Sequence, residues 1–172
     1  MFARRAILPD ATAVEQLIRV HVPDGTLLPR SLPELCENIR DFVVLESGGE
    51  IVGCGALHLY GVHLAEIRSI TVRDDYKGKG CGRILVNALL EEAHHQHVTC
   101  VCLFTRIPEF FAGIGFQIAE RTAIPDKLYK DCVNCPRIHN CDETAMYRGE
   151  LPSVAILAPP HAISESLLEI LR

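Results

Sequence analysis

Residues 68–83 read RSITVRDDYKGKGCGR, an apolar strand that runs into a glycine-rich turn and then into a helix. Gly78, Gly80 and Gly82 carry no Cβ atoms, so successive backbone N–H groups of the turn can converge on one anion. The helix predicted from about Arg83 adds the positive end of its dipole. The pattern therefore predicts a phosphate-binding turn, and the plainer alternative is a structural turn before a helix.

The residues around these glycines favour the anion site. Lys77, Lys79 and Arg83 bring mobile positive charge to the turn. The G-x-G-x-G spacing differs from the G-x-G-x-x-G dinucleotide fingerprint, and the sequence has no G-x-x-x-x-G-K-S/T nucleotide loop. Lys77 to Gly82 instead resembles the pyrophosphate-binding signature of the GNAT acetyltransferases, Gln/Arg-x-x-Gly-x-Gly/Ala, with Lys77 where Gln or Arg is usual. The resemblance implies acetyl-CoA as cosubstrate, bound by Lys77, Gly78, Lys79, Gly80, Cys81, Gly82 and Arg83.

Composition agrees with a globular enzyme. The chain has 172 residues, of which 48% are hydrophobic, enough to bury a full core as one domain. A net charge of -5 argues against nucleic acid as a partner. The charged N-terminus lacks a following apolar run of signal-peptide length, and no apolar stretch is long enough to span a membrane. We therefore expect a cytoplasmic protein without a membrane partner.

Hydrophobic patterning predicts alternating strands and helices. Strands are expected over residues 4–8, 42–46, 51–59, 64–72 and 99–105 and from Phe116, with a hairpin turn over residues 47–50. A first helix is expected after Asp10, its N-cap, with one face formed by Val14, Leu17, Ile18 and His21. A second is expected over 31–39, where Ser31 and Glu34 form a capping box. Two more are expected over 83–95 and over 108–112. This order predicts an α/β fold with a mixed, mostly antiparallel central sheet flanked by helices, which matches the GNAT fold.

The expected domain organisation is a GNAT acetyltransferase domain over residues 1–150, with a cysteine-rich insertion at about 121–143. A C-terminal tail, residues 151–172, contains a short helix with an apolar stripe over 164–172. That helix would dock either on the domain or on a second subunit, and the second case makes a homodimer.

Three stretches resemble one branch of the family more closely. They are Gly53–His58, Ala65–Val72 and Pro108–Phe116, and Lys130–Glu143 resembles a segment of some of the same proteins. The branch is the short amino-acid N-acetyltransferases of arginine biosynthesis, the N-acetylglutamate synthases. The resemblance implies transfer of the acetyl group of acetyl-CoA to the α-amine of glutamate, a small-molecule substrate. The alternatives are a GNAT enzyme acting on glutamine, a polyamine or a protein amine, and a non-catalytic acyl-CoA sensor.

The resemblance also implies residues for the chemistry. A bulge in the strand before the turn would let backbone groups of Ile70, Thr71 and Val72 pair with the pantetheine arm and donate to the thioester oxygen. Glu66 is the candidate general base, directly or through a water, and otherwise an ordinary surface carboxylate. Phe111 packs against the pantetheine or the core. Many family members have a tyrosine near this position to protonate the CoA thiolate, so that role has no assigned residue.

Arginines are the candidate ligands of a glutamate acceptor, because a guanidinium binds a planar carboxylate through two parallel hydrogen bonds. Arg30 and Arg106 match positions at which N-acetylglutamate synthases carry substrate-binding arginines. At the position that matches Arg68, the long, kinase-fused synthases carry a smaller residue, so this chain departs from them there. Ser69 adds a hydroxyl contact or is a packing residue. Each arginine taken alone would be an ordinary surface residue.

The cysteines divide into two groups. Cys36, Cys54, Cys81, Cys100 and Cys102 sit singly in apolar or helix-like segments and are predicted to be small core residues. Cys132, Cys135 and Cys141 cluster with His139, a ligand set that suits tetrahedral zinc in part of its spacing. A local disulfide and three free thiols are the alternatives. In every case we expect a structural role, because GNAT chemistry needs no metal.

Overall fold

The computed structural model describes residues 1–152 of the 172. The chain forms two compact units, the first from residues 1–58 and 66–96 and the second from residues 59–65 and 97 onward. The predicted tail helix over 164–172 lies outside the described residues, and the single-domain organisation stays a prediction.

Four strands are neighbours in chain order: β1 (Phe2–Arg5), β2 (Phe42–Ser47), β3 (Glu50–Gly61) and β4 (Leu64–Val72). They belong to the first unit except for residues 59–65, the end of β3 and the start of β4, which belong to the second. β1 pairs with β2 and β2 with β3, both antiparallel. Gly48 and Gly49, with φ of 61° and 83°, form the predicted β2–β3 turn, where two successive left-handed residues favour glycine. The bounds of β4 agree with the prediction.

The start of the chain differs from the sequence expectation. β1 ends at Arg5, and residues 8–10 form a short 3-10 turn that contains Pro9. Asp10 was expected to cap α1 (Ala11–Val20), but its carboxylate accepts the Ile7 N–H at 2.8 Å and pairs with Arg4 at 2.7 Å. The ion pair with Arg4 outcompetes the local cap. The pKa of Asp10 is lowered, first by the hydrogen bond from Arg4 and also by the Ile7 N–H.

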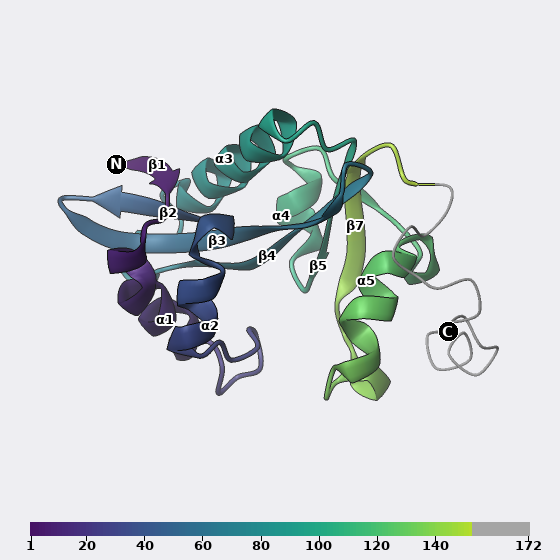
Figure 1. Ribbon diagram of the computed structural model, residues 1–172, viewed down its shortest axis with the longest axis horizontal. Coiled ribbons are helices and arrows are strands. Elements are labelled where there is room, and N and C mark those ends of the chain that lie inside the picture. The colour runs from purple at the N-terminus through teal and green to yellow at the C-terminus, as the bar shows by residue number, and fades with distance from the viewer. Residues whose placement is uncertain (153–172) are drawn as a thin grey trace. The chain divides into compact units, whose positions relative to one another are not determined.

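Helices cover both faces of these strands. α1 and α2 (Leu32–Glu37) lie on one face and α3 (Cys81–His95) on the other (Figure 1). The predicted apolar stripe of α1 is confirmed, because Val14 and Ile18 are buried. With Leu35, Phe42, Val44 and Cys54 they form one core cluster.

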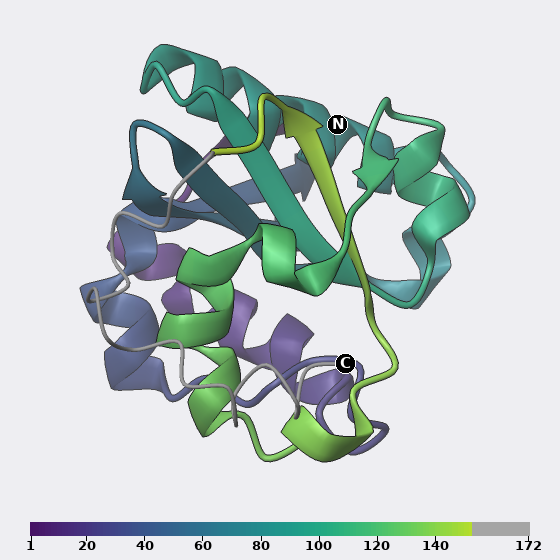
Figure 2. The same cartoon turned by 90° about the vertical axis from the view of Figure 1, so that its right-hand side faces the viewer.

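The second unit has a smaller set of strands. β7 (Thr144–Gly149) runs between β5 (Cys100–Thr105) and β6 (Gln117–Ile118) and is antiparallel to both (Figure 2). α4 covers Pro108–Ala112, as predicted. The sequence analysis missed β7, because its buried residues, Ala145 and Met146, are too few to give a clear alternating pattern. Around them, the core cluster contains Tyr60, Leu64, Cys100, Cys102 and Ile124.

The insertion between β6 and β7 contains a helix that the sequence analysis also missed. α5 (Pro125–Lys130) begins at a proline and is one and a half turns long, too short for a clear helical period. It is held to the β3–β4 connection: Asp126, fully buried, lies 3.0 Å from His63 Nε2, and Tyr60 donates to Asp131 at 2.7 Å. Within residues 1–152, every helix falls short of the length and apolarity needed to cross a bilayer.

Candidate functional site

Ser69 is the backbone anomaly of β4. Its φ is 52°, a left-handed conformation that a non-glycine residue within a strand rarely adopts. Such a residue is typical of a strand irregularity, and strained backbone collects at functional sites. The deviation directly precedes Ile70, Thr71 and Val72, where the sequence analysis expected a bulge and backbone groups for the thioester.

The glycine-rich turn has the open backbone that an anion site requires. Gly78 and Gly80 have φ of 75° and 80°, and a Cβ added at either would meet no atom within 4 Å. α3 begins at Cys81 with Gly80 as its N-cap, two residues before the predicted start at Arg83, because left-handed Gly80 already ends the turn. Gly82 therefore lies in the first turn of a fifteen-residue helix, at the positive end of its dipole.

Lysines of this turn have partners in the structure without ligand. Lys77 Nζ lies 2.6 Å from Asp74, and this hydrogen bond is the main cause of the lowered pKa of the Asp74 carboxyl. Lys79 Nζ lies 5.0 Å from the ring centroid of Tyr76, within cation–π distance. Lys77 and Lys79 are exposed, as is Arg83 on α3, so an anion can approach all three.

A pocket in the first unit joins two of the predicted substrate arginines. Its volume is about 250 Å³, part of which is open solvent. Arg30, from the loop before α2, and Arg68, on β4, both line it. The other lining residues form two groups. The polar ones lie on α2 or after it and are Glu34, Asn38 and Asp41, and the apolar ones are Leu35, Phe42 and Ala56.

The pocket has balanced charge, because its lining includes two arginines and two carboxylates, Glu34 and Asp41. Arg30 Nη1 donates to the carboxylate of Glu34. Asp41 lies 4.0 Å from His58 Nδ1. The sequence analysis missed Glu34, Asn38 and Asp41 as site residues. The only available signal was the i,i+4 spacing of Arg30 and Glu34, which by itself indicates an ordinary surface ion pair.

Glu66 lies in the same strand as Arg68. It is 3% exposed, so the surface-carboxylate alternative is wrong. One residue, Ile67, separates it from Arg68, and alternate residues of a strand point to the same face. The carboxylate therefore shares a face of β4 with a residue that lines the pocket.

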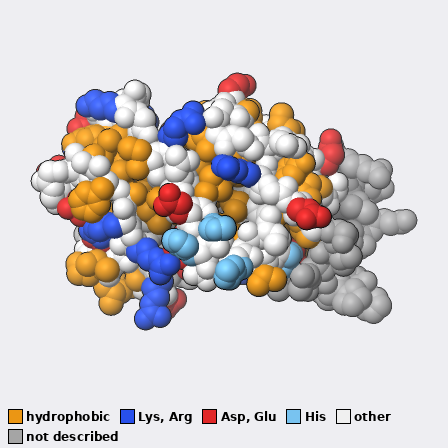
Figure 3. Space-filling model, turned by 90° about the horizontal axis from the view of Figure 1, so that it is seen from above, with side chains coloured by type: hydrophobic (Ala, Val, Ile, Leu, Met, Phe, Trp, Pro, Cys, Tyr) orange, Lys and Arg blue, Asp and Glu red, His pale blue; other side chains and the backbone are white. Residues whose placement is uncertain are grey.

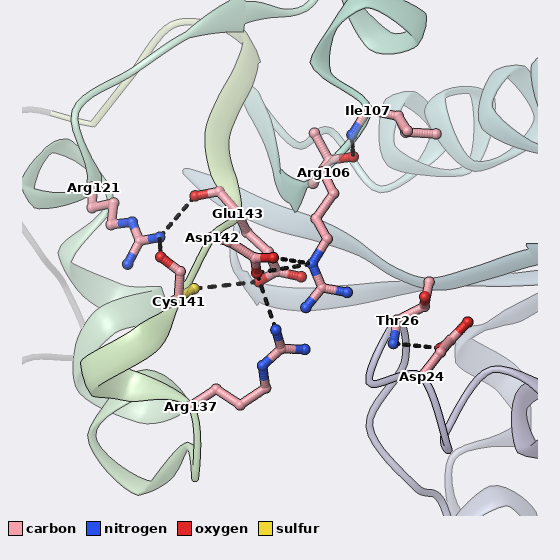
Figure 4. A network of polar contacts seen from close by, with 10 residues as sticks. Asp24, Thr26, Arg106, Ile107, Arg121, Arg137, Cys141, Asp142 and Glu143 are labelled. Atoms are coloured by element: carbon pink, nitrogen blue, oxygen red, sulfur yellow. Dashed lines mark hydrogen bonds and ion pairs between the residues drawn. The ribbon is translucent and has the colours of Figure 1, made fainter.

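Arg106 belongs to the second unit and is engaged there. Its Nε donates to both carboxylate oxygens of Asp142, at 2.8 and 2.9 Å, and Arg137 donates to the same carboxylate at 3.1 Å (Figure 4). The hydrogen bond from Arg106 is the main cause of the lowered pKa of Asp142. Nearby, Arg121 fixes the insertion by donating to the carbonyls of Cys141 and Glu143. The predicted substrate role of Arg106 stays a prediction.

Phe111 is buried in α4 of the second unit. Its ring meets Phe110 and Phe116 edge-to-face, at centroid distances of 4.9 and 5.8 Å. Of the two packing roles expected for this ring, the structure records the contacts within the protein.

The cysteine-rich insertion does not bring its candidate zinc ligands, Cys132, Cys135, His139 and Cys141, together around one point. Among residues 1–152, no group of three or more His, Cys, Asp or Glu side chains is placed to hold a metal ion, so the zinc hypothesis is not supported. All eight cysteines are free thiols, and Cys132, Cys135 and Cys141 are half-buried. Cys36 was expected in the core but is exposed, because it lies on the outer face of short α2. Burial raises the pKa of Cys54 to about 12 and that of Cys100 to about 11.

Charge on the surface is mixed. On the described part of the face shown in Figure 3, basic and acidic side chains lie among hydrophobic ones.

The strand irregularity, the open glycine turn and α3 all lie within a region that matches a known family. The model of the acetyltransferase (GNAT) family matches residues 15–116, more than half of the chain. The chain belongs to the GNAT family of acetyltransferases. The expected GNAT fold, with a mixed sheet flanked by helices, is thereby confirmed.

Two relatives and one solved structure show which acetyltransferases this chain is similar to. An uncharacterized N-acetyltransferase of Chlorobaculum tepidum is 37% identical over 84% of this chain and 94% of its own length. An amino-acid acetyltransferase of Mycobacterium tuberculosis is 34% identical over 74% of this chain and 75% of its own. The structure of N-acetylglutamate synthase from Neisseria gonorrhoeae with coenzyme A and N-acetyl-glutamate superposes with a TM-score of 0.76 at 27% identity, over 87% of this chain and 35% of that one. The GNAT proteins similar to this chain thus include amino-acid acetyltransferases and a coenzyme A complex.

Proposed function

We propose that this protein is an acetyl-CoA-dependent amino-acid N-acetyltransferase whose acceptor is glutamate, an N-acetylglutamate synthase. The observation that carries the proposal is the pocket lined by Arg30 and Arg68. Two guanidinium groups suit the two carboxylates of glutamate, because each can bind a planar carboxylate through parallel hydrogen bonds. The similarity to relatives named amino-acid acetyltransferases supports the same acceptor class.

The reaction can be assigned to residues of the chain. The turn at Lys77 to Gly82 and the start of α3 bind the pyrophosphate of acetyl-CoA. Backbone N–H groups after the irregularity at Ser69 donate to the thioester oxygen, where negative charge develops. Glu66 removes a proton from the α-ammonium of glutamate, directly or through a water. The amine then attacks the thioester carbon, and the C–S bond breaks as CoA leaves as the thiolate. The nitrogen loses its second proton to water as the amide forms, and the thiolate takes a proton from water.

A panel of acceptors tests the proposal. Purified protein is given acetyl-CoA with each amino acid, with spermidine or with a peptide, and free CoA is measured. We expect the highest kcat/KM with glutamate, and mass spectrometry should find the acetyl group on its α-nitrogen. If glutamine is preferred, the enzyme is still an amino-acid N-acetyltransferase and only the choice of glutamate is wrong. Turnover confined to spermidine or peptides would refute the amino-acid proposal. Acetyl-CoA binding without turnover of any amine would support the acyl-CoA sensor.

A further inference from the structure

Glu34 departs from its expected local role. It is the third residue of α2, where Ser31 is the N-cap and accepts the backbone N–H of Glu34 at 3.4 Å. A glutamate at this position normally turns back to the N–H of the cap residue and completes a capping box. Here its carboxylate accepts from Arg30 instead. A residue that gives up a local stabilising contact for another partner is a candidate for a functional role.

That ion pair lies inside the pocket. Arg30 and Glu34 both line it, and their side chains are 23% and 38% exposed. Arg68 is the second guanidinium of the pocket and Asp41 the second carboxylate. Glu34 therefore occupies part of the donor fork of Arg30 that a carboxylate ligand would use.

We propose that Glu34 is a specificity-determining residue: its carboxylate holds Arg30 until a carboxylate of the acceptor replaces it. This inference rests on the proposed function, because it concerns how that pocket selects its acceptor. An anion that contacts Arg30 alone forms one ion pair with Arg30 but breaks the ion pair between Arg30 and Glu34, so it gains no net binding free energy. A ligand that engages further groups of the pocket recovers the difference, so the pocket rejects simple carboxylates and accepts amino acids.

The charge-removing variant Glu34→Gln tests the proposal. Gln has nearly the same helix propensity as Glu and the same shape, so α2 is kept. The matched control is Glu37→Gln, which removes an equal charge from an exposed position of the same helix outside the pocket. Both variants are compared with wild type for KM of glutamate, for kcat, and for binding of glutarate, a dicarboxylate of the same length without the amine.

We expect Glu34→Gln to bind glutarate about three- to tenfold more tightly and to lower the KM for glutamate, because the competing charge is gone. The acetyl-CoA affinity and the Glu37→Gln control should remain as in wild type. Unchanged or weaker glutarate binding in Glu34→Gln would overturn the inference, since Glu34 would then only orient Arg30 or play no part. If wild type turns over no amino acid, the proposed function fails; if it does and the variant shows no gain, only the role of Glu34 fails.

Discussion

At the scale of single residues, the arginines show how structure changes the meaning of a sequence feature. Arg30, Arg68 and Arg106 look alike in the sequence as isolated cations. The structure places Arg30 and Arg68 at one pocket and pairs Arg106 with Asp142, whose two carboxylate oxygens both accept from Nε of the guanidinium. A carboxylate acceptor must therefore exchange with an existing partner at Arg30, and the same holds at Arg106 if it contacts the acceptor.

Arg30→Ala should raise the KM for glutamate while leaving the acetyl-CoA affinity nearly unchanged. A charged hydrogen-bonding contact is worth about 1.5 to 3 kcal/mol, so kcat/KM should fall about tenfold or more. Steady-state kinetics with each substrate varied in turn measure both effects. Arg40→Ala, at an exposed arginine that does not line the pocket, is the control. Arg106→Ala should behave like Arg30→Ala, and equal weakening of both substrates in either variant would point to misfolding or to a CoA-binding role.

Glu66→Gln should lower kcat and spare ligand binding. A general base contributes about 10² to 10⁴-fold in rate, and glutamine keeps the shape of the side chain but cannot take the proton. Stopped assays give kcat, and titration with CoA gives cosubstrate affinity. If kcat stays at the wild-type level, Glu66 is a buried structural carboxylate and the base lies elsewhere.

At the scale of elements, the turn before α3 depends on backbone that only glycine adopts freely. Gly80 has φ of 80° and opens the helix, so a side chain there would strain the backbone and also stand where the phosphates approach. A side chain at Gly49, in the β2–β3 turn, would strain the backbone in the same way, but away from the proposed phosphate site. Its φ is 83°, and an added Cβ would again meet no atom within 4 Å.

Gly80→Ala should therefore lose about 1 kcal/mol of stability and also bind acetyl-CoA markedly more weakly. Gly49→Ala should show a similar loss in denaturant unfolding with unchanged acetyl-CoA affinity. Gly82→Ala, in the first turn of the helix, should weaken acetyl-CoA binding too. Wild-type titration curves for Gly80→Ala and Gly82→Ala would make the turn purely structural.

At the scale of the whole molecule, the free cysteines report on how well each part of the fold is protected. Cys54 and Cys100 are buried, and the raised pKa of each thiol leaves almost no reactive thiolate at pH 7 to 8. Cys36 is exposed, and the insertion cysteines are half-buried.

Alkylation of the native protein should thus label Cys36 first, then Cys132, Cys135 and Cys141, and leave Cys54 and Cys100 unmodified until the protein unfolds. Peptide mass spectrometry over a time course gives the order. Rapid labelling of Cys54 under native conditions would show that its part of the core opens. Bound zinc would instead protect the insertion cysteines, and a chelator would restore their labelling.

The sequence determined the family, the glycine-rich turn before α3 and most of the elements, because glycine spacing and apolar periodicity are local and can be recognised without knowledge of the fold. It did not reveal β7 or α5, which are short. β7 is held by pairing with β5 and β6, and α5 by the His63–Asp126 pair, with Tyr60–Asp131 directly after it. It also misplaced the role of Asp10, since the choice between a helix cap and an ion pair depends on where Arg4 lies. The Arg30–Glu34 pair is local, but spacing alone does not say whether Glu34 turns to Arg30 or back to the cap of α2. Only tertiary structure could decide that Arg68 joins the same pocket and that Glu66 is buried, because both depend on residues brought together from distant elements.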